Sequence, residues 1–311
     1  MPRYEVRRSI TIKAVPERVF ETVADFGTWT TWSPWLCTEP DAQVTVTDDP
    51  NSVGSLYSWQ GELVGVGEIE HQYLEPGLLI EEELRFFKPF RSKARVSFEF
   101  EPADEGTRIT WTMQGSMPWF LFFMTSMMKA MIGMDYDRGL KMLKELIETG
   151  EVLSTTTIGD VEPVGPLQMA GVRRSCTLAE IGPAMTSAFE EVKEKFCQLD
   201  LPTDGGGAVS VYLSVDMKKQ EFDFISGFLL PESFSGSVGG LTRWSTPQVN
   251  ALRIDHTGRY EHVGNAWSAA HQVARYRKIK LRKSGAFEIY RNDPEETAPA
   301  DLQTEIFLPL K

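Results

Sequence analysis

The chain has 311 residues, 41% hydrophobic and 24% charged, which is typical of a soluble globular protein of two domains. Its formal net charge of -12 argues against direct binding of nucleic acid or of an anionic membrane, because the long-range field would repel both. The three cysteines cannot form an even disulfide framework, and the N-terminus lacks an apolar signal core, so we expect a cytoplasmic location.

The first half of the chain predicts an antiparallel sheet. An alternating strand over residues 4–13 is followed by a short amphipathic helix that begins at Pro16. Further strand-like segments are separated by Gly, Pro or charged turns, and they cover residues 55–59, 64–73, 78–86, 93–100 and 108–114. Polar and apolar residues alternate well in the last two segments, which predicts one buried and one wet sheet face.

A long helix with a methionine-rich face follows the strands. Its first half carries methionines at helical spacing, which are Met124, Met127, Met128 and Met131. Methionine is flexible and polarizable and suits a surface that closes over variable shapes, although an ordinary core helix could use the same residues. Because the sheet contributes tryptophans, we predict an apolar pocket lined by Trp59, Trp111, Met124 and Met128.

The apolar stretch over residues 117–134 resembles a membrane span in composition only. It is short for a bilayer and is interrupted by Thr125, Ser126 and Lys129. We therefore expect no membrane insertion and interpret the stretch as part of the helix that lines the pocket.

One acidic residue in the predicted sheet is ambiguous. Strict alternation places Glu82 on the same face as Ile80 and Leu84, where it could anchor a ligand inside the pocket. A one-residue bulge or an exposed face would put it in water, and we favour that interpretation.

This element order resembles the helix-grip fold of the SRPBCC superfamily, also called START-like or polyketide-cyclase-like, over residues 4–151. The residues that carry the resemblance are Pro16-Glu17-Arg18-Val19-Phe20, the aromatic run 29–35, Trp59-Gln60-Gly61, Gly106-Thr107 with Trp111, and Gly139-Leu140. The resemblance implies a cavity between helix and sheet in which superfamily members bind lipids, polyketides or hormones. It implies no particular activity.

Residues 153–168 predict a linker between a first domain of residues 1–152 and a second domain of residues 169–311. The segment is rich in threonine and in breakers such as Gly159, Pro163 and Pro166, and it has no helical period.

The second domain predicts the order strand, helix, strand, strand twice, an internal duplication of α+β type. The first repeat covers residues 169–176, 183–199, 209–215 and 221–230, and the second covers 249–256, 263–280, 286–290 and 303–308. Two such repeats side by side create a cleft along their junction, where a ligand is expected.

The strand over residues 286–290 has an acid at its centre. Alternation places Glu288 with Ala286 and Tyr290 on one face. If that face is covered, the carboxylate must be paired, hydrogen-bonded or protonated, because desolvation of a charge is costly. An acid on the wet side of an edge strand is the alternative interpretation.

The second domain resembles the GyrI-like, or effector-binding, domain of bacterial transcription activators. The motifs that carry the resemblance are His256-Thr257-Gly258-Arg259-Tyr260, the helix with Trp267, the run from Phe287 to Pro294, and Thr304-Glu305-Ile306-Phe307-Leu308-Pro309. The resemblance implies binding of cationic or aromatic small molecules in an aromatic cleft whose central acid matches Glu288. It also implies a possible hydrolase activity on cyclopropane-bearing compounds.

The residues support binding chemistry better than most catalysis. No metal motif, nucleophile elbow or nucleotide-binding loop is present, so we expect no metal and no cofactor. A buried carboxylate attracts a cationic ligand, and aromatic rings add to that attraction. The candidate rings around Glu288 are Tyr212, Phe224, Trp244, Tyr260, Trp267 and Tyr290, although each ring alone is more often a core residue.

Three functions remain open. The first is binding of small amphipathic, aromatic or cationic molecules, for sensing or sequestration, with Trp244 in a glycine-rich loop that acts as a lid. The second is a hydrolase of electrophilic aromatic compounds, with Glu288 as general base and Tyr260 as hydrogen-bond donor. The third is a regulatory protein that reports ligand occupancy to a transcription factor as its protein partner.

Overall fold

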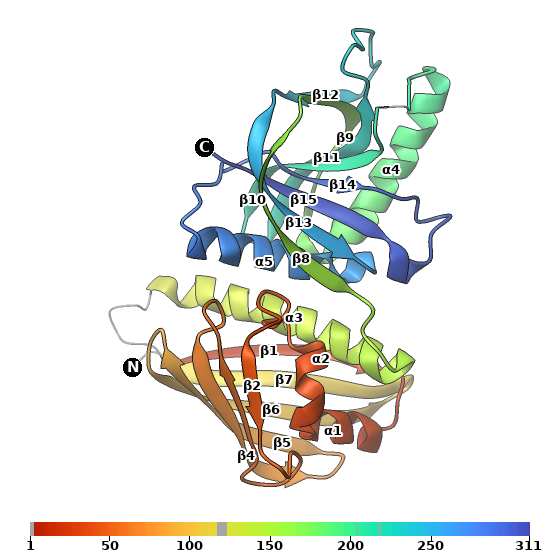
Figure 1. Ribbon diagram of the computed structural model, residues 1–311. Coiled ribbons are helices and arrows are strands. Elements are labelled where there is room, and N and C mark those ends of the chain that lie inside the picture. Colours follow the sequence, from red (N-terminus) through yellow and green to blue (C-terminus); the bar gives the residue numbers. More distant parts are fainter. Residues whose placement is uncertain (1–2, 117–122, 204, 218) are drawn as a thin grey trace. The chain divides into compact units, whose positions relative to one another are not determined.

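The computed structural model describes residues 3–116, 123–203, 205–217 and 219–311 (Figure 1). The chain divides into two compact units, Met1–Leu153 and Ser154–Lys311, here called unit 1 and unit 2. Each unit combines helices with its own antiparallel sheet, which confirms the α+β prediction.

Unit 1 is a seven-stranded sheet in the order β1-β7-β6-β5-β4-β3-β2. Its strands are β1 (Arg3–Ile12), β2 (Gln43–Val46), β3 (Leu56–Gln60), β4 (Val66–Glu75), β5 (Leu79–Lys88), β6 (Ser92–Ala103) and β7 (Gly106–Ser116). Its helices are α1 (Pro16–Ala24), the 3-10 turn η1 (Phe26–Thr28), α2 (Trp29–Trp32) and α3 (Thr125–Thr149). α3 lies along one face of the sheet (Figure 1).

Local sequence explains these elements. Pro16 occupies the first turn of α1, where its missing N–H is harmless, and Val19, Phe20 and Val23 form the buried face. In β6, Ala94, Val96, Phe98 and Phe100 are buried and the residues between them are more exposed. α3 ends at Thr149, and the next residue, Gly150, has the left-handed backbone that suits a helix C-cap.

Glu82 is buried, so the favoured interpretation of an exposed face or a bulge is wrong. Its Oε1 lies 3.1 Å from His71 Nδ1, and the ring's Nε2 bonds the carbonyl of Ala24 at 2.8 Å. The bulge lies in the partner strand, between His71 and Tyr73, so β5 keeps its alternation through Glu82. Burial raises the pKa of Glu82, and His71 opposes that shift.

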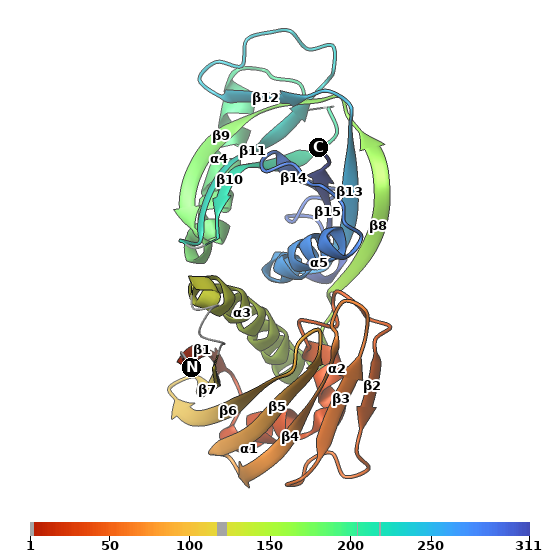
Figure 2. The ribbon, with the colours of Figure 1, turned by 90° about the vertical axis from the view of Figure 1, so that its left-hand side faces the viewer.

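Unit 2 is an eight-stranded sheet in the order β12-β9-β11-β10-β14-β15-β13-β8. Its strands are β8 (Thr155–Val164), β9 (Leu167–Thr177), β10 (Ala208–Asp216), β11 (Glu221–Leu230), β12 (Thr242–Thr246), β13 (Val249–Thr257), β14 (Ala286–Tyr290) and β15 (Gln303–Pro309). Its helices are α4 (Ile181–Gln198) and α5 (Val263–Tyr276), with 3-10 turns η3 (Leu178–Glu180), η4 (Tyr260–His262) and η5 (Pro299–Asp301). Figure 2 shows the sheet curving strongly between its edges.

The two repeats of unit 2 meet at the pair formed by β10 and β14. β9, α4, β10 and β11 form the first repeat, and β13, α5, β14 and β15 form the second. α4 packs mainly on β9 and β11, whereas α5 packs mainly on β13, β8 and β15. The junction strands β10 and β14 therefore lie between the strands that α4 covers and the strands that α5 covers.

The prediction of a linker over residues 153–168 is wrong for most of that segment, because residues 155–164 form β8. This strand pairs with β13 along the edge of the sheet. The β-branched residues of the segment favour a strand. Gly159 lies where the register shifts, and a side chain there would meet the carbonyl of Arg253, so the glycine permits the pairing rather than ending it.

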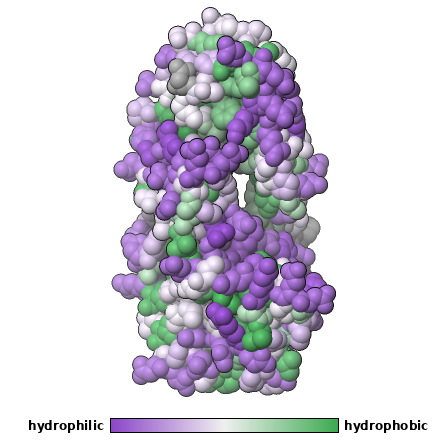
Figure 3. All heavy atoms as spheres, turned by 90° about the vertical axis from the view of Figure 1, so that its right-hand side faces the viewer, coloured by the Kyte–Doolittle hydropathy of each residue, from purple (hydrophilic) through white to green (hydrophobic). Residues whose placement is uncertain are grey.

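The surface is largely polar. The face visible in Figure 3 is mostly hydrophilic in both units, with hydrophobic groups scattered over it. Within the described ranges, no helix is long and apolar enough to cross a membrane. Residues 117–122 of the apolar stretch lie outside the described residues.

Candidate functional site

Glu288 lies at the centre of the sheet of unit 2. It pairs with Ser210 of β10 on one side and with Ile306 of β15 on the other. Its neighbours Phe287 and Ile289 belong to the apolar core on the opposite face, so alternation turns Glu288 toward the helices. Only 3% of its surface is exposed, which excludes the alternative of a wet edge strand.

Three neutral donors hold the carboxylate of Glu288. The Tyr212 hydroxyl donates to Oε1 at 3.1 Å, Trp267 Nε1 donates to the same oxygen, and the Tyr290 hydroxyl donates to Oε2. Two strands and one helix therefore converge on the acid. None of the ion pairs found among the described residues includes Glu288, so its negative charge meets dipoles rather than a cation.

Burial dominates the electrostatics of the cluster. Desolvation raises the pKa of Glu288 above its ordinary value, and the hydrogen bonds from Tyr290, Trp267 and Tyr212 only partly oppose it. Burial and the nearby carboxylate together raise the pKa values of both tyrosines well above their usual range. The two hydroxyls therefore keep their protons and remain donors.

Aromatic rings surround the carboxylate. Trp267 packs edge-on against Tyr212 with centroids 5.0 Å apart, and Phe224 lies 6.3 Å from the same tyrosine. Tyr260 packs edge-on against Tyr290 at 5.5 Å and is 38% exposed, which makes it the outermost ring of the group. Burial, with a smaller contribution from Glu288, raises the pKa of Tyr260 to about 12.

Trp244 does not belong to this group, which corrects two predictions. Its ring packs on Phe287 at 6.0 Å, and Phe287 points away from Glu288 because the two are neighbours in one strand. Trp244 also lies in β12, which pairs with β9, rather than in a loop that could close as a lid. The segment from Thr242 to Thr246 pairs with β9 in continuous register, so the backbone on both sides of Trp244 is held in the sheet.

The structure adds site residues that the sequence did not indicate. Ser210 Oγ lies 3.3 Å from the hydroxyl oxygen of Tyr290, to which it can donate because the tyrosine's own proton goes to Glu288, and it shares a 2.7 Å hydrogen bond with Ser226. From α4, Phe189 packs edge-on against Tyr290 at 5.6 Å, and Met185 Sδ lies 3.9 Å from the same hydroxyl. The internal duplication could have indicated Ser210. The third strands of the two repeats, β10 and β14, pair with each other, and Ser210 lies opposite Glu288 in that pair.

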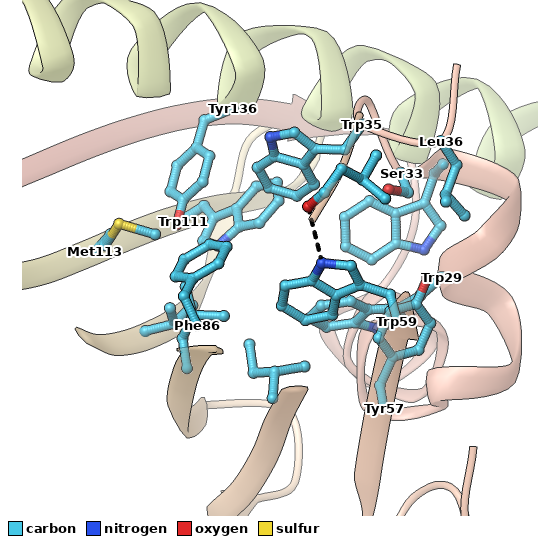
Figure 4. A pocket seen from close by; sticks show the side chains of 15 residues that line it. Trp29, Ser33, Trp35, Leu36, Tyr57, Trp59, Phe86, Trp111, Met113 and Tyr136 are labelled. Carbon is cyan, nitrogen blue, oxygen red and sulfur yellow. Dashed lines mark hydrogen bonds between the residues drawn. The ribbon is translucent and has the colours of Figure 1, made fainter. Parts of the chain in front are cut away.

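A cavity of about 100 Å³ lies in unit 1, between α2, α3 and the sheet (Figure 4). Trp59 and Trp111 line it, together with Tyr136 of α3. Met124 and Met128 do not line it, contrary to the prediction. The buried positions of α3 begin at Gly133, so the first turns of the helix lie beyond the cavity and leave Met124 exposed.

The described residues hold no cluster of three or more His, Cys, Asp or Glu that could bind a metal ion. His71, which faces Glu82, and His256, whose pKa burial lowers to about 4, are both enclosed in the protein.

Comparisons with known proteins match the two units separately. Residues 3–148 match the family described as polyketide cyclase / dehydrase and lipid transport, and residues 160–311 match the GyrI-like small molecule binding domain. Among solved structures, the chain resembles protein CV1439 from Chromobacterium violaceum, with 19% identity and a TM-score of 0.37 over 46% of this chain and 97% of that one. It also resembles the Aha1 dimer from Colwellia psychrerythraea, with 19% identity and a TM-score of 0.36 over 47% and 98% of the two chains. The comparison with curated proteins returns no match.

Proposed function

Because the chain joins a polyketide cyclase-like domain to a GyrI-like small molecule binding domain, we propose that unit 2 binds small aromatic cations at Glu288, for sensing or sequestration. One observation carries the proposal. Glu288 is a buried carboxylate whose hydrogen-bond donors, Tyr212, Trp267 and Tyr290, are all neutral.

The energetics of a buried charge support this proposal. An uncompensated carboxylate in a low-dielectric site carries a desolvation cost, which neutral donors reduce but do not cancel. An organic cation brings the missing opposite charge. Rings such as Trp267 and Tyr212 add cation–π attraction of roughly 0.5–2 kcal/mol each. The same surroundings would disfavour an anion.

The exposure of the rings supports a route of approach. Tyr260 is exposed, and Trp267 and Tyr290 are partly exposed, whereas Glu288 behind them is buried. A flat ligand that enters between α4 and α5 would meet these rings before the carboxylate. The junction strands β10 and β14 form the floor of this proposed cleft.

A pair of isosteric ligands tests the proposal. Trimethylphenylammonium carries a permanent positive charge, and tert-butylbenzene has the same shape without it. We expect calorimetric titration to show saturable binding of the cation only. Glu288→Gln should weaken that binding roughly thirtyfold or more, because it removes the buried charge and little volume.

Glu261→Gln is the matched control for this experiment. Glu261 is exposed and adjoins Tyr260, so the variant loses the same charge near the entrance without touching the buried cluster. We expect its affinity for trimethylphenylammonium to stay within about threefold of the unmodified protein, because an exposed charge is well screened. Equal affinity for the two ligands, or an unchanged affinity in Glu288→Gln, would contradict the proposal.

Hydrolysis of an electrophilic ligand is the second candidate. The observation that favours it is the state of Glu288 Oε2, which accepts one hydrogen bond while Oε1 accepts two. The remaining acceptor position and a raised pKa suit a general base that takes a proton from water. The water oxygen would bond to one carbon of an electrophilic cyclopropane as a ring C–C bond breaks, and the carbon that takes that electron pair would receive the proton held by Glu288. Incubation with an acceptor-substituted aromatic cyclopropane in H₂¹⁸O should then yield a ring-opened ¹⁸O-labelled alcohol, and Glu288→Gln should abolish it.

A further inference from the structure

We propose that Ser210 and Ser226 are positioning residues that stabilise the charged carboxylate of Glu288. They act through the hydroxyl of Tyr290 and so extend cation binding to lower pH. The inference rests on the proposed function, because a cation is attracted only by the charged acid. It goes beyond that function by identifying what sets the pH range of the site.

The two serines and the acid form a row across neighbouring strands. Ser226 of β11 pairs with Ser210 of β10, and Ser210 pairs with Glu288 of β14. Residues directly opposite each other in an antiparallel sheet share a face, so both serines lie on the helix-facing side with the carboxylate. Ser226 Oγ and Ser210 Oγ are 2.7 Å apart, and Ser210 Oγ lies 3.3 Å from the Tyr290 hydroxyl. That hydroxyl in turn donates to Glu288 Oε2.

The number of available protons fixes the direction of this chain. It contains three hydrogen bonds, and three hydroxyl groups must supply all the protons, because an ionised carboxylate only accepts. Each hydroxyl therefore donates to the next group in the row, and the chain ends at the carboxylate. Hydrogen bonds aligned in this way polarise one another, so a tyrosine that accepts from a serine is a stronger donor to the acid.

The surroundings of the two serines offer their hydroxyl groups no other role. Both side chains are fully buried, and neither has another side-chain hydrogen bond among the described residues. On its other side Ser226 pairs with Val172 of β9, which packs in one apolar core with residues of α4. A buried pair of hydroxyls is costly to desolvate, and an apolar pair of the same size would avoid that cost. The link to Tyr290 gives the hydroxyls a function that an apolar pair could not serve.

The electrostatics of the cluster agree with this direction. Burial raises the pKa of Glu288, and among the hydrogen bonds that oppose this rise the one from Tyr290 is the largest. Burial also raises the pKa of Tyr290, and the hydrogen bond from Ser210 opposes that rise, as a donor to the tyrosine oxygen should. Without the serines, Glu288 would therefore hold its proton to higher pH.

Several ionisable side chains surround Glu288, and the measurement must distinguish their titration from its own. The nearest are Tyr212 of β10, Tyr290 of β14, Tyr260 of η4 and, beside Trp267 on α5, His271. Behind these, Cys176 acts on Tyr212 and Asp293 acts on Tyr260. The neighbours from α4 and β15 are uncharged, namely Met185, Phe189 and Ile306. A signal from the Glu288 carboxyl itself is therefore needed.

A ¹³C titration of the full chain tests the inference without a ligand. The protein is labelled at the side-chain carboxyl carbon of glutamate, and the Glu288 signal is identified by its loss in Glu288→Gln. In Ser210→Ala we expect its midpoint to rise by about 0.4 pH unit, because the tyrosine becomes a weaker donor. Ser226→Ala should shift the midpoint in the same direction by about 0.1–0.2 unit, and this variant replaces Ser210→Ala if the latter does not fold.

Two comparisons separate this role from a structural one. Thr304→Val removes another buried hydroxyl, which lies opposite Tyr290 in β15 and has no hydrogen-bond partner among the described residues. Its midpoint should stay within about 0.1 unit of the unmodified protein, because this hydroxyl is outside the chain. In Tyr290→Phe, which breaks the chain, adding Ser210→Ala should leave the midpoint unchanged. An unchanged midpoint in both serine variants, or an equal effect of Ser210→Ala with and without the tyrosine hydroxyl, would overturn the inference.

Binding of trimethylphenylammonium gives the functional readout. Below the midpoint, its affinity for Ser210→Ala should be about 2.5-fold weaker, in proportion to the lost fraction of charged acid, and at high pH the variant and the unmodified protein should bind alike. A loss of affinity that is the same at every pH would contradict a role through ionisation. If the unmodified protein does not bind this cation, the proposed function fails, while the carboxyl titration still decides the role of the serines.

Discussion

A carboxylate that accepts three hydrogen bonds at the centre of a sheet is held in place but remains expensive to charge. Glu288 is in this position, since Tyr212, Trp267 and Tyr290 fix its geometry while burial raises its pKa. Function and stability therefore conflict at one residue. The ionised form that attracts a cation is the form that the fold disfavours.

This conflict predicts a pH-dependent gain of stability in Glu288→Gln. The raised pKa means that folding favours the protonated acid, so its stabilising contribution is full below the ordinary value of 4.5 and is lost as pH rises through the raised value. The variant has no such loss. We expect its melting temperature, relative to the unmodified protein, to rise between pH 4 and pH 8, by about 2–4 °C for each kcal/mol.

The same titration has an opposite effect on binding. Affinity for trimethylphenylammonium should increase over that pH range, because the ligand's charge is permanent and only the protein titrates. If the melting temperatures of Glu288→Gln and of the unmodified protein differ by the same amount from pH 4 to pH 8, ionisation of Glu288 does not destabilise the folded protein.

Single residues were the hardest level to predict from sequence. Alternation placed Glu288 with Tyr290 correctly, but it could not decide whether that face was covered. Glu82 was misjudged because its partner, His71, lies in a neighbouring strand and no local pattern indicates it. Trp244 was assigned to the site because composition does not show on which face a ring lies.

At the level of elements, close pairing of β3 and β4 sets one wall of the cavity in unit 1. Trp59 and Gly67 are directly opposite each other in these strands. A methyl group on Gly67 would lie 2.4 Å from the indole of Trp59 and 2.9 Å from the carbonyl of Arg85. The glycine therefore makes room for a ring that lines the cavity.

Gly67→Ala is predicted to displace the indole of Trp59 and to destabilise unit 1. Overpacking of this kind typically costs about 1–3 kcal/mol of stability, and here the indole is the part that moves. The measurements are thermal unfolding and the tryptophan fluorescence spectrum of the folded protein. An unchanged melting temperature with an unchanged spectrum would show that Gly67 is not needed to make room for Trp59.

Elements with strong alternation were predictable, and those at sheet edges were not. The strands near β6 and β7 followed from period-two patterns, and α3 followed from its apolar spacing. β8 and β12 were missed because they are edge strands that contain or adjoin Gly and Pro, and edge strands tolerate those residues. Their pairing depends on distant partners, β13 and β9, which a local pattern does not reveal.

At the level of the whole molecule, two units with separate sheets and cores share one chain. The order of motifs along the sequence was sufficient to predict this organisation, since each resemblance covered one half. We propose a domain boundary at residues 153 and 154, rather than the predicted linker of residues 153–168, because β8 belongs to the second sheet.

Separate expression tests that boundary. Residues 1–153 and 154–311 should each unfold in one cooperative transition, as followed by circular dichroism, because each contains a complete sheet. A fragment of residues 165–311 is the control. It lacks β8 and exposes the edge of β13, so we expect a lower melting temperature and aggregation. Equal stability of the two C-terminal fragments would contradict the proposed boundary.

The duplication of unit 2 has a further consequence. Ser210 and Glu288 face each other across the junction, and Tyr212 and Tyr290 each lie two residues further along their own strands. These four residues are thus related by an approximate two-fold axis, but of the equivalent positions 210 and 288 only the second carries an acid. If both positions were acidic, a ligand could bind in two equivalent orientations. With serine on one side, the proposed site has a stoichiometry of one cation per chain and a single direction of entry for its charged end.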